Sequence, residues 1–217
     1  MNSRWVKSES ILDTSSTSNG NTADQCTTLP KPGGPLKPRL DAVQKKIHVQ
    51  ISRLEEIYEL LKLRDKEIFQ KLTLSIKQND AQHSAVILSE LTKTRQVSRV
   101  TILSCIALEK LMGKLSSASD FGDVVTILSP AMAVVKNLRS SLTPYVPEME
   151  ENLGVISELL SGILVDAGQV GGHTINFEVA NAGAVGLIGE ASIAADQKVK
   201  EELPDIPDLP AISMKFV

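Results

Sequence analysis

The chain contains few of the residues on which most active sites and disulfide frameworks depend. Its 217 residues include two cysteines, three histidines and one tryptophan, and aromatic residues make up 3% of the sequence. Cys26 and Cys105 lie far apart and neither belongs to a CxxC pair, which argues against a disulfide framework or a zinc site and favours a reducing cytoplasm. The scarcity of aromatic side chains favours a helical hairpin or bundle, because leucine, isoleucine and valine suffice for its core.

Long apolar runs are also missing. The longest mainly apolar run, Val124 to Val135, is interrupted by polar residues and a proline, so no membrane-spanning helix is predicted. The N-terminus lacks the continuous apolar region of a signal peptide. Residues 1–36 are predicted to be a disordered tail, since they are rich in serine, threonine, asparagine, glycine and proline. An alternative for its start is a short amphipathic membrane anchor built on Trp5.

No pattern of catalytic or cofactor-binding residues is evident. His48, His83 and His173 are isolated, without HxxxH or HExxH spacing. The glycines at 183, 186 and 189 follow no predicted strand, so close helix packing explains them better than a phosphate-binding loop. There is no Walker motif and no GxSxG elbow. We therefore expect a protein that is not an enzyme and has no cofactor, metal or catalytic residue.

Helical periodicity begins at about Arg39. Apolar residues recur at alternating steps of four and three, with Asp65 as the one polar exception, and predict a helix of roughly 38 residues. The sequence KQND at 77–80 is a turn signal, and a second stripe runs from Ile87 to Leu115. Two long helices joined by a short turn must lie antiparallel to bury their stripes. The fold class is therefore all-α, with a long antiparallel helical hairpin.

Shorter helices are predicted after the hairpin. One spans about 121–140, with Ser119 or Asp120 as its cap and a kink or restart at Pro130. Another begins near Pro147, and DAGQVGGHT at 166–174 forms a flexible joint before a final helix at about 176–202. The chain is predicted to consist of five segments. They are a disordered tail at 1–36, the hairpin at 37–117, two helices within 118–170, a flexible joint with an acidic helix at 171–202, and a proline-rich tail at 203–217.

Charge is distributed unevenly along the chain. Residues 37–117 hold 15 Lys/Arg and 9 Asp/Glu, a net charge of +6, whereas residues 118–217 hold 5 and 14, a net charge of −9. On the first helix, a basic ribbon of five residues falls within about 40° on the helical wheel: Arg39, Lys46, Arg53, Arg64 and Lys71. Such a ribbon suits an anionic membrane surface. The alternatives are a solvated face with helix ion pairs, and nucleic acid, which the lack of interleaved aromatics disfavours.

A second candidate site lies near the C-terminus, in the sequence EELPDIPDLP. Pro204, Pro207 and Pro210 recur at every third residue, and each follows an apolar residue, namely Leu203, Ile206 or Leu209. Because polyproline II has three residues per turn, prolines and apolar residues would form two adjacent edges. The segment is predicted to be a stiff ligand for a partner groove, or alternatively a helix stopper and spacer.

These features together resemble the ESCRT-III family, and in particular its archaeal CdvB-type branch. The resemblance covers about residues 35–210 and rests on the hairpin, the turn KQND, the acidic helices and the final LPDIPDLP. It implies helical subunits that polymerise with paralogues into filaments on the inner face of the cell membrane and constrict it during division. It also implies removal of subunits by an AAA ATPase, whose MIT domain binds a tail motif of the form LPxVPxxPLP.

The match to that tail motif is good in its first half. Leu203, Pro204, Ile206 and Pro207 match the motif's core, whereas Leu209 and Pro210 correspond to its second half but come earlier. Only seven residues follow Pro210, so we expect a short form without the winged-helix domain found in some members. The alternative function is a cytosolic helical scaffold or adaptor without membrane activity.

Overall fold

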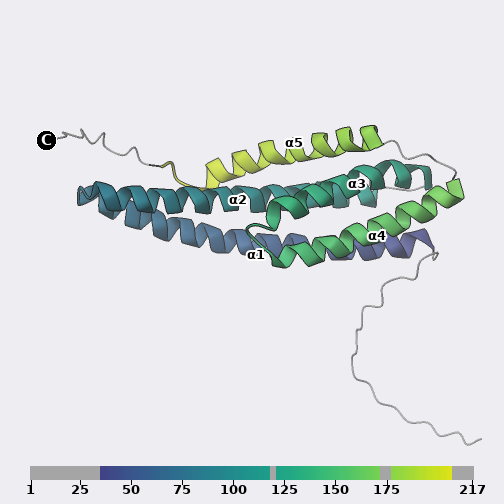
Figure 1. Cartoon of the computed structure of the whole chain (residues 1–217), viewed down its shortest axis with the longest axis horizontal. Helices are drawn as coiled ribbons and strands as arrows, with labels where there is room; N and C mark the ends of the chain where they lie inside the picture. The colour runs from purple at the N-terminus through teal and green to yellow at the C-terminus, as the bar shows by residue number, and fades with distance from the viewer. Residues whose placement is uncertain (1–34, 118–120, 172–176, 207–217) are drawn as a thin grey trace, which may run out of the picture.

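The computed structural model describes residues 35–117, 121–171 and 177–206. Within these ranges the chain forms five helices and no strand: α1 (Leu36–Lys77), α2 (Ala81–Ser116), α3 (Phe121–Leu142), α4 (Glu148–Gly171) and α5 (Phe177–Glu202). The α1–α2 hairpin runs the length of the molecule, and α3, α4 and α5 pack along it so that its closed end projects beyond them (Figure 1). The all-α fold class predicted from the sequence is confirmed.

The hairpin forms because both long helices carry a continuous buried stripe. On α1 the stripe includes Val43, Ile47 and Leu54, and on α2 it includes Leu108 and Leu111. Each large aliphatic side chain that is buried in this way contributes about 1.5–3 kcal/mol. The 42 residues of α1 extend for about 63 Å, so neither helix can bury its stripe except along the other.

The turn at the closed end of the hairpin is tight and is held by local hydrogen bonds. Asn79 adopts φ 58°, a left-handed conformation that asparagine tolerates better than most residues. The Asp80 side chain caps α2 by accepting a hydrogen bond from the backbone N–H of His83 at 3.0 Å. The hydroxyl of Ser84 donates to the backbone oxygen of Asp80 at 2.7 Å. The predicted turn at 77–80 is therefore confirmed.

The shorter helices complete the core. Buried apolar residues from all five helices form one main cluster, to which α5 contributes Ala184, Leu187, Ala191 and Ala195. Small side chains let α5 lie close to its neighbours: a Cβ added at Gly183 would come within 3.3 Å of the Pro130 ring on α3. Helix packing therefore explains Gly183 as predicted, whereas Gly186 and Gly189 face open space.

A polar layer separates the main core from the closed end of the hairpin. Ile68, Leu72, Ile87 and Leu91 form a second, smaller apolar cluster near the turn. Between the clusters the fully buried Asp65 accepts hydrogen bonds from Arg95 of α2, at 2.7 Å from Nε and 3.2 Å from Nη2. The polar exception in the α1 stripe is thus one half of an ion pair that joins the two helices.

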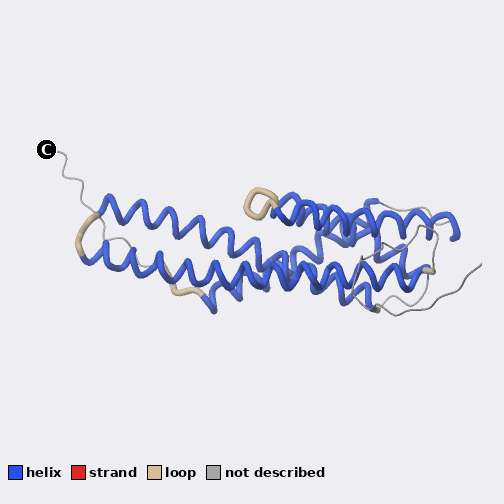
Figure 2. The backbone as a smooth tube through the Cα atoms, turned by 90° about the horizontal axis from the view of Figure 1, so that it is seen from below, coloured by secondary structure: helices blue, strands red, loops and turns tan. Residues whose placement is uncertain are grey.

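Two details differ from the sequence-based expectations. The predicted joint at 166–174 is helical through Gly171, because the last turns of α4 pack on the hairpin through Ile163, Leu164 and Ala167. The helix does not restart at Pro130, because α3 continues on both sides of it as a single element; the kink given as the alternative stays a prediction. Figure 2 shows the helices and the short loops that join them from a second direction.

Several expectations fall outside the described residues. They concern residues 1–34 of the N-terminal tail with Trp5 and Cys26, the caps Ser119 and Asp120, His173, and the tail residues Pro207, Leu209 and Pro210.

We predict that Asp65→Ala lowers the free energy of unfolding by about 3 kcal/mol, because it leaves the Arg95 guanidinium, 15% exposed, without its partner carboxylate. Urea unfolding followed by circular dichroism measures the effect. The double variant Asp65→Leu/Arg95→Met serves as the control and is expected to recover most of the loss, since no uncompensated charge remains. Equal destabilisation in both variants would contradict this role for the ion pair.

Candidate functional site

The basic ribbon of α1 is partly occupied by acidic residues of other helices. Arg39 is buried, and its Nη1 donates a hydrogen bond to Oδ2 of Asp166 on α4. A glycine faces this guanidinium, since a Cβ at Gly162 would lie 3.3 Å from Arg39 Nη2. Arg53 Nη2 donates to Glu148 Oε2 of α4 at 2.8 Å.

The other three ribbon residues differ in their surroundings. Arg64 Nη2 donates to Glu90 Oε1 of α2 at 2.7 Å. Lys46 is half-buried and Lys71 is exposed. Within residues 35–117, 121–171 and 177–206, no carboxylate lies in ion-pair range of either lysine. The ribbon is therefore partly neutralised within the chain and partly available to a partner.

Helix α5 is bound to the hairpin by a similar set of ion pairs. Lys110 Nζ lies 2.6 Å from Glu190 Oε2, and Lys62 Nζ lies 2.9 Å from Glu202 Oε2. Arg99 binds Asp196 with two nitrogens, and its Nη2 also donates to Ser192 Oγ at 3.1 Å. Hydrogen bonding from Arg99 lowers the pKa of Asp196, and hydrogen bonding from Lys110 lowers the pKa of Glu190.

We refer to these five cross-helix pairs together as the acidic clasp: Asp166–Arg39, Glu148–Arg53, Glu190–Lys110, Asp196–Arg99 and Glu202–Lys62. Every carboxylate of the clasp comes from α4 or α5 and every cation from α1 or α2. Three of the pairs are solvent-exposed, Glu202–Lys62 is half-buried, and Arg39 of the fifth pair is buried. An exposed pair contributes only about 0.2–1 kcal/mol and weakens as salt increases. The clasp therefore combines three individually weak links with two that are better shielded from solvent.

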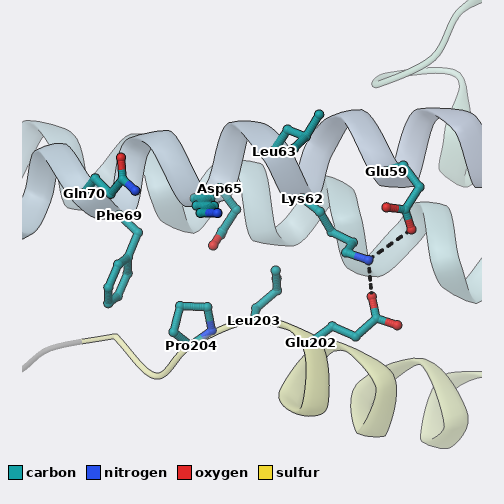
Figure 3. Close-up of a pocket in the computed structure, with 10 residues that line it drawn as sticks. Glu59, Lys62, Leu63, Asp65, Phe69, Gln70, Glu202, Leu203 and Pro204 are labelled. Atoms are coloured by element: carbon teal, nitrogen blue, oxygen red, sulfur yellow. Dashed lines mark hydrogen bonds and ion pairs between the residues drawn. The ribbon is translucent and has the colours of Figure 1, made fainter.

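The first residues of the proline-rich tail lie in a groove on α1. Figure 3 shows Leu203 directed toward α1 and Pro204 beside Phe69. The groove has a volume of about 520 Å³, and Lys62, Asp65 and Phe69 are among the residues that line it. Leu203 is 8% exposed, whereas Ile206 is 41% exposed. Of the predicted partner-binding residues, Leu203 is therefore covered by the hairpin in this conformation and Ile206 is accessible.

Comparison with known proteins identifies the family. No family model and no solved structure matches the chain. Cell division protein B1 of Sulfolobus acidocaldarius is 30% identical over 184 residues, which cover 85% of this chain and 86% of that protein. The chain belongs to the archaeal CdvB-type ESCRT-III family. A second member, cell division protein B of the same organism, is 26% identical over 176 residues, or 81% of this chain and 67% of that protein.

Sequence reasoning found the cations of this CdvB-type chain more readily than their partners. The ribbon residues share one helix and could be placed on a helical wheel. The clasp cations Lys62, Arg99 and Lys110 lie outside the ribbon, and their acidic partners come from other helices. The opposite net charges of residues 37–117 and 118–217 indicate that the two parts attract each other, but these totals do not identify which residues form ion pairs.

The remaining candidate groups are Cys105 and two of the histidines. Cys105 is buried, as the sequence predicted, and burial raises the pKa of its thiol to about 12. It lies near the exposed carboxylates Glu55 and Glu109, but a thiol must lose its proton to bind a metal or act as a nucleophile. His48 and His83 are exposed. No helix in the described part of the chain has both the length and the apolar character needed to cross a bilayer.

Tyr58 lies where the end of α5 meets α1. It is buried, and the ammonium groups of Lys62 and Lys198 each lie 5.6 Å from its ring centroid. Burial raises the pKa of Tyr58 to about 12, and the Glu202 carboxylate adds to this shift. Tyr58 therefore lies beside the Lys62–Glu202 pair of the clasp, and the pKa of its hydroxyl reports on whether that pair is closed.

We predict that Tyr58 ionises near pH 12 in the folded protein, measured as tyrosinate absorbance in a Tyr145→Phe background that leaves Tyr58 as the single tyrosine. In the unfolded chain its pKa is about 10. The stability from neutral Tyr58 is therefore complete below about pH 10 and is lost as the pH rises from 10 to 12. Glu202→Gln should lower the folded-state pKa. A midpoint of about 10 in the folded protein would show that α5 does not cover Tyr58 in solution.

Proposed function

We propose that this protein is a filament-forming subunit that acts on the inner face of the archaeal cell membrane during cell division. The observation that carries the proposal is its similarity, over 85% of the chain, to a protein named as a cell division protein. Filament formation with paralogues, attachment to anionic lipid and removal by an AAA ATPase with an MIT domain are parts of the proposal, and none involves catalysis by this chain.

The distribution of charge supports an electrostatic attachment to lipid. Lys46 and Lys71 have no carboxylate of the described residues in ion-pair range, and Arg64 pairs with Glu90 of α2. Arg39 and Arg53 pair with carboxylates of α4, and Arg53 also lies 3.6 Å from Glu56 of its own helix. Each cation near an anionic bilayer contributes about 1 kcal/mol, which salt screens. Five cations hold one subunit weakly, and a polymer would be held strongly because its subunits bind together.

The acidic clasp supports regulation of this attachment. Its carboxylates compete with lipid phosphates for the same kind of cation. Each exposed pair of the clasp contributes about 0.2–1 kcal/mol, and a lipid surface contributes about 1 kcal/mol for each cation that it engages. An exposed clasp cation can therefore exchange its carboxylate for lipid at little cost, whereas the buried Arg39 and the apolar contacts of α4 and α5 favour the closed form. Assembly on the membrane can then shift the balance through multivalency.

We predict that reversing the ribbon charges, by changing Arg39, Lys46, Arg53, Arg64 and Lys71 to glutamate, lowers co-sedimentation of the full chain with anionic vesicles at least tenfold. Neutralising the clasp should have the opposite effect, because it releases cations without adding any; the variant is Glu148→Gln/Asp166→Asn/Glu190→Gln/Asp196→Asn/Glu202→Gln. Electron microscopy with and without vesicles would show whether filaments form.

Two controls distinguish the effect of the changed charges on vesicle binding from a loss of folded structure. Arg39 is buried, so a smaller variant with glutamate only at the exposed or half-buried Lys46, Arg64 and Lys71 tests the ribbon without breaking an ion pair to α4. Circular dichroism checks helicity in each case. Unchanged vesicle binding after charge reversal, with discrete oligomers that ignore lipid, would instead indicate a cytosolic scaffold.

We predict that Ile206→Asp weakens binding of an isolated MIT domain at least tenfold, or about 1.4 kcal/mol, because a charge would enter an apolar groove of the partner. Titration calorimetry with the full chain measures it. Ile206 is exposed, so this variant leaves the protein's own core intact. Leu203→Asp should also weaken binding but would disturb the groove on α1. Equal affinity of the Ile206→Asp variant and the original chain would show that the tail motif is misassigned.

A further inference from the structure

The outer face of α1 carries exposed apolar side chains that the core does not use. Val49, Leu60, Leu63 and Leu74 are 61%, 66%, 61% and 58% exposed. They are separated by 11, 3 and 11 residues, and eleven residues of an α-helix return to within about 20° of the starting direction. The four side chains therefore fall within about 60° of one another, roughly opposite Leu54 and Tyr58, which are buried. We call these four residues the apolar stripe.

The apolar stripe runs beside the basic ribbon. At 100° per residue, Lys46, Arg53, Arg64 and Lys71 lie about 60° to one side of it. The stripe spans about 37 Å of the helix, which is most of the length of the ribbon. Figure 1 shows that the C-terminal half of α1 extends past α3 and α4. A helix face with leucine and valine beside lysine and arginine has the composition of an interfacial membrane helix.

We propose that the apolar stripe enters the interfacial layer of an anionic membrane, while the basic ribbon binds the lipid headgroups. This rests on the proposed function and adds to it a second, salt-insensitive contribution to binding. Exposed leucines favour the acyl chains through the hydrophobic effect, which depends little on ionic strength.

Two carboxylates set the depth of this contact. Glu56 and Glu67 lie within the stripe on the helical wheel; both are exposed, and Glu56 lies 3.6 Å from Arg53. Charged carboxylates must stay hydrated, so the helix axis remains at headgroup level and only the ends of the four apolar side chains reach the acyl chains. A shallow position of this kind is typical of helices that lie in the membrane interface.

The closing test uses the full chain and two kinds of vesicle, phosphatidylcholine mixed with phosphatidylglycerol and phosphatidylcholine alone. Leu63 also lines the groove that holds Leu203, so the test changes the other two neighbouring members of the stripe. We predict that Val49→Ser/Leu60→Ser lowers partitioning to the anionic vesicles about tenfold and removes the binding that persists at high salt. The matched control is Val86→Ser/Ile193→Ser, at two residues that are 65% and 72% exposed on α2 and α5, and it should bind like the original chain.

A fluorescence experiment tests insertion directly. The chain has one tryptophan, so Trp5→Phe/Leu60→Trp places a single reporter on the stripe, and Trp5→Phe/Val86→Trp places one elsewhere. Lipids with brominated acyl chains should quench the first reporter and not the second.

The outcomes separate this inference from the proposed function. If the serine variant binds vesicles normally and the Leu60→Trp reporter is not quenched, insertion is wrong, while binding through the ribbon stands. Loss of self-association by the serine variant without lipid, again without quenching, would make the stripe a contact with a second copy and overturn the inference. Failure of the original chain to bind anionic vesicles at all would defeat the membrane function itself.

Discussion

The burial of the apolar faces of α1 and α2 against each other is the constraint on which the rest of this molecule depends. Because the two helices can exclude water from these buried faces only along their whole length, the hairpin becomes a rod about 63 Å long. The shorter helices then pack on a surface that already exists. Their order along the hairpin decides which charges meet, and so the positions of the acidic clasp follow from the length and register of the hairpin.

The contacts made by the hairpin and by the clasp differ in strength and in reversibility. Buried leucines and isoleucines hold α1 to α2, and the Asp65–Arg95 pair fixes how the two helices are aligned. Ion pairs hold α4 and α5 together with buried apolar residues such as Leu153 and Ile156 of α4 and Leu187 of α5. Salt or competing anions would therefore weaken the exposed pairs of the clasp without removing these apolar contacts.

Helix α1 presents different chemistry on each of its faces. Its buried face meets α2, one flank carries the basic ribbon, the outer face carries the apolar stripe, and the other flank forms the groove that holds Leu203. The groove, the clasp and Tyr58 meet near Lys62, which contacts both Glu59 and Glu202. A substitution of Lys62 would therefore alter the contacts of both the tail and α5.

The sequence by itself determined the helices, the turn at 77–80 and the hairpin, because periodicity, capping and turn residues act over a few neighbouring positions. It also determined that a basic half is followed by an acidic half. Only the tertiary structure decided that Asp166 meets Arg39, that Asp196 meets Arg99, and that Leu203 is covered while Ile206 is not. It also extended α4 through the predicted joint. These features depend on side chains that are distant in sequence, and their pairing is set by how whole helices pack, which no local pattern records.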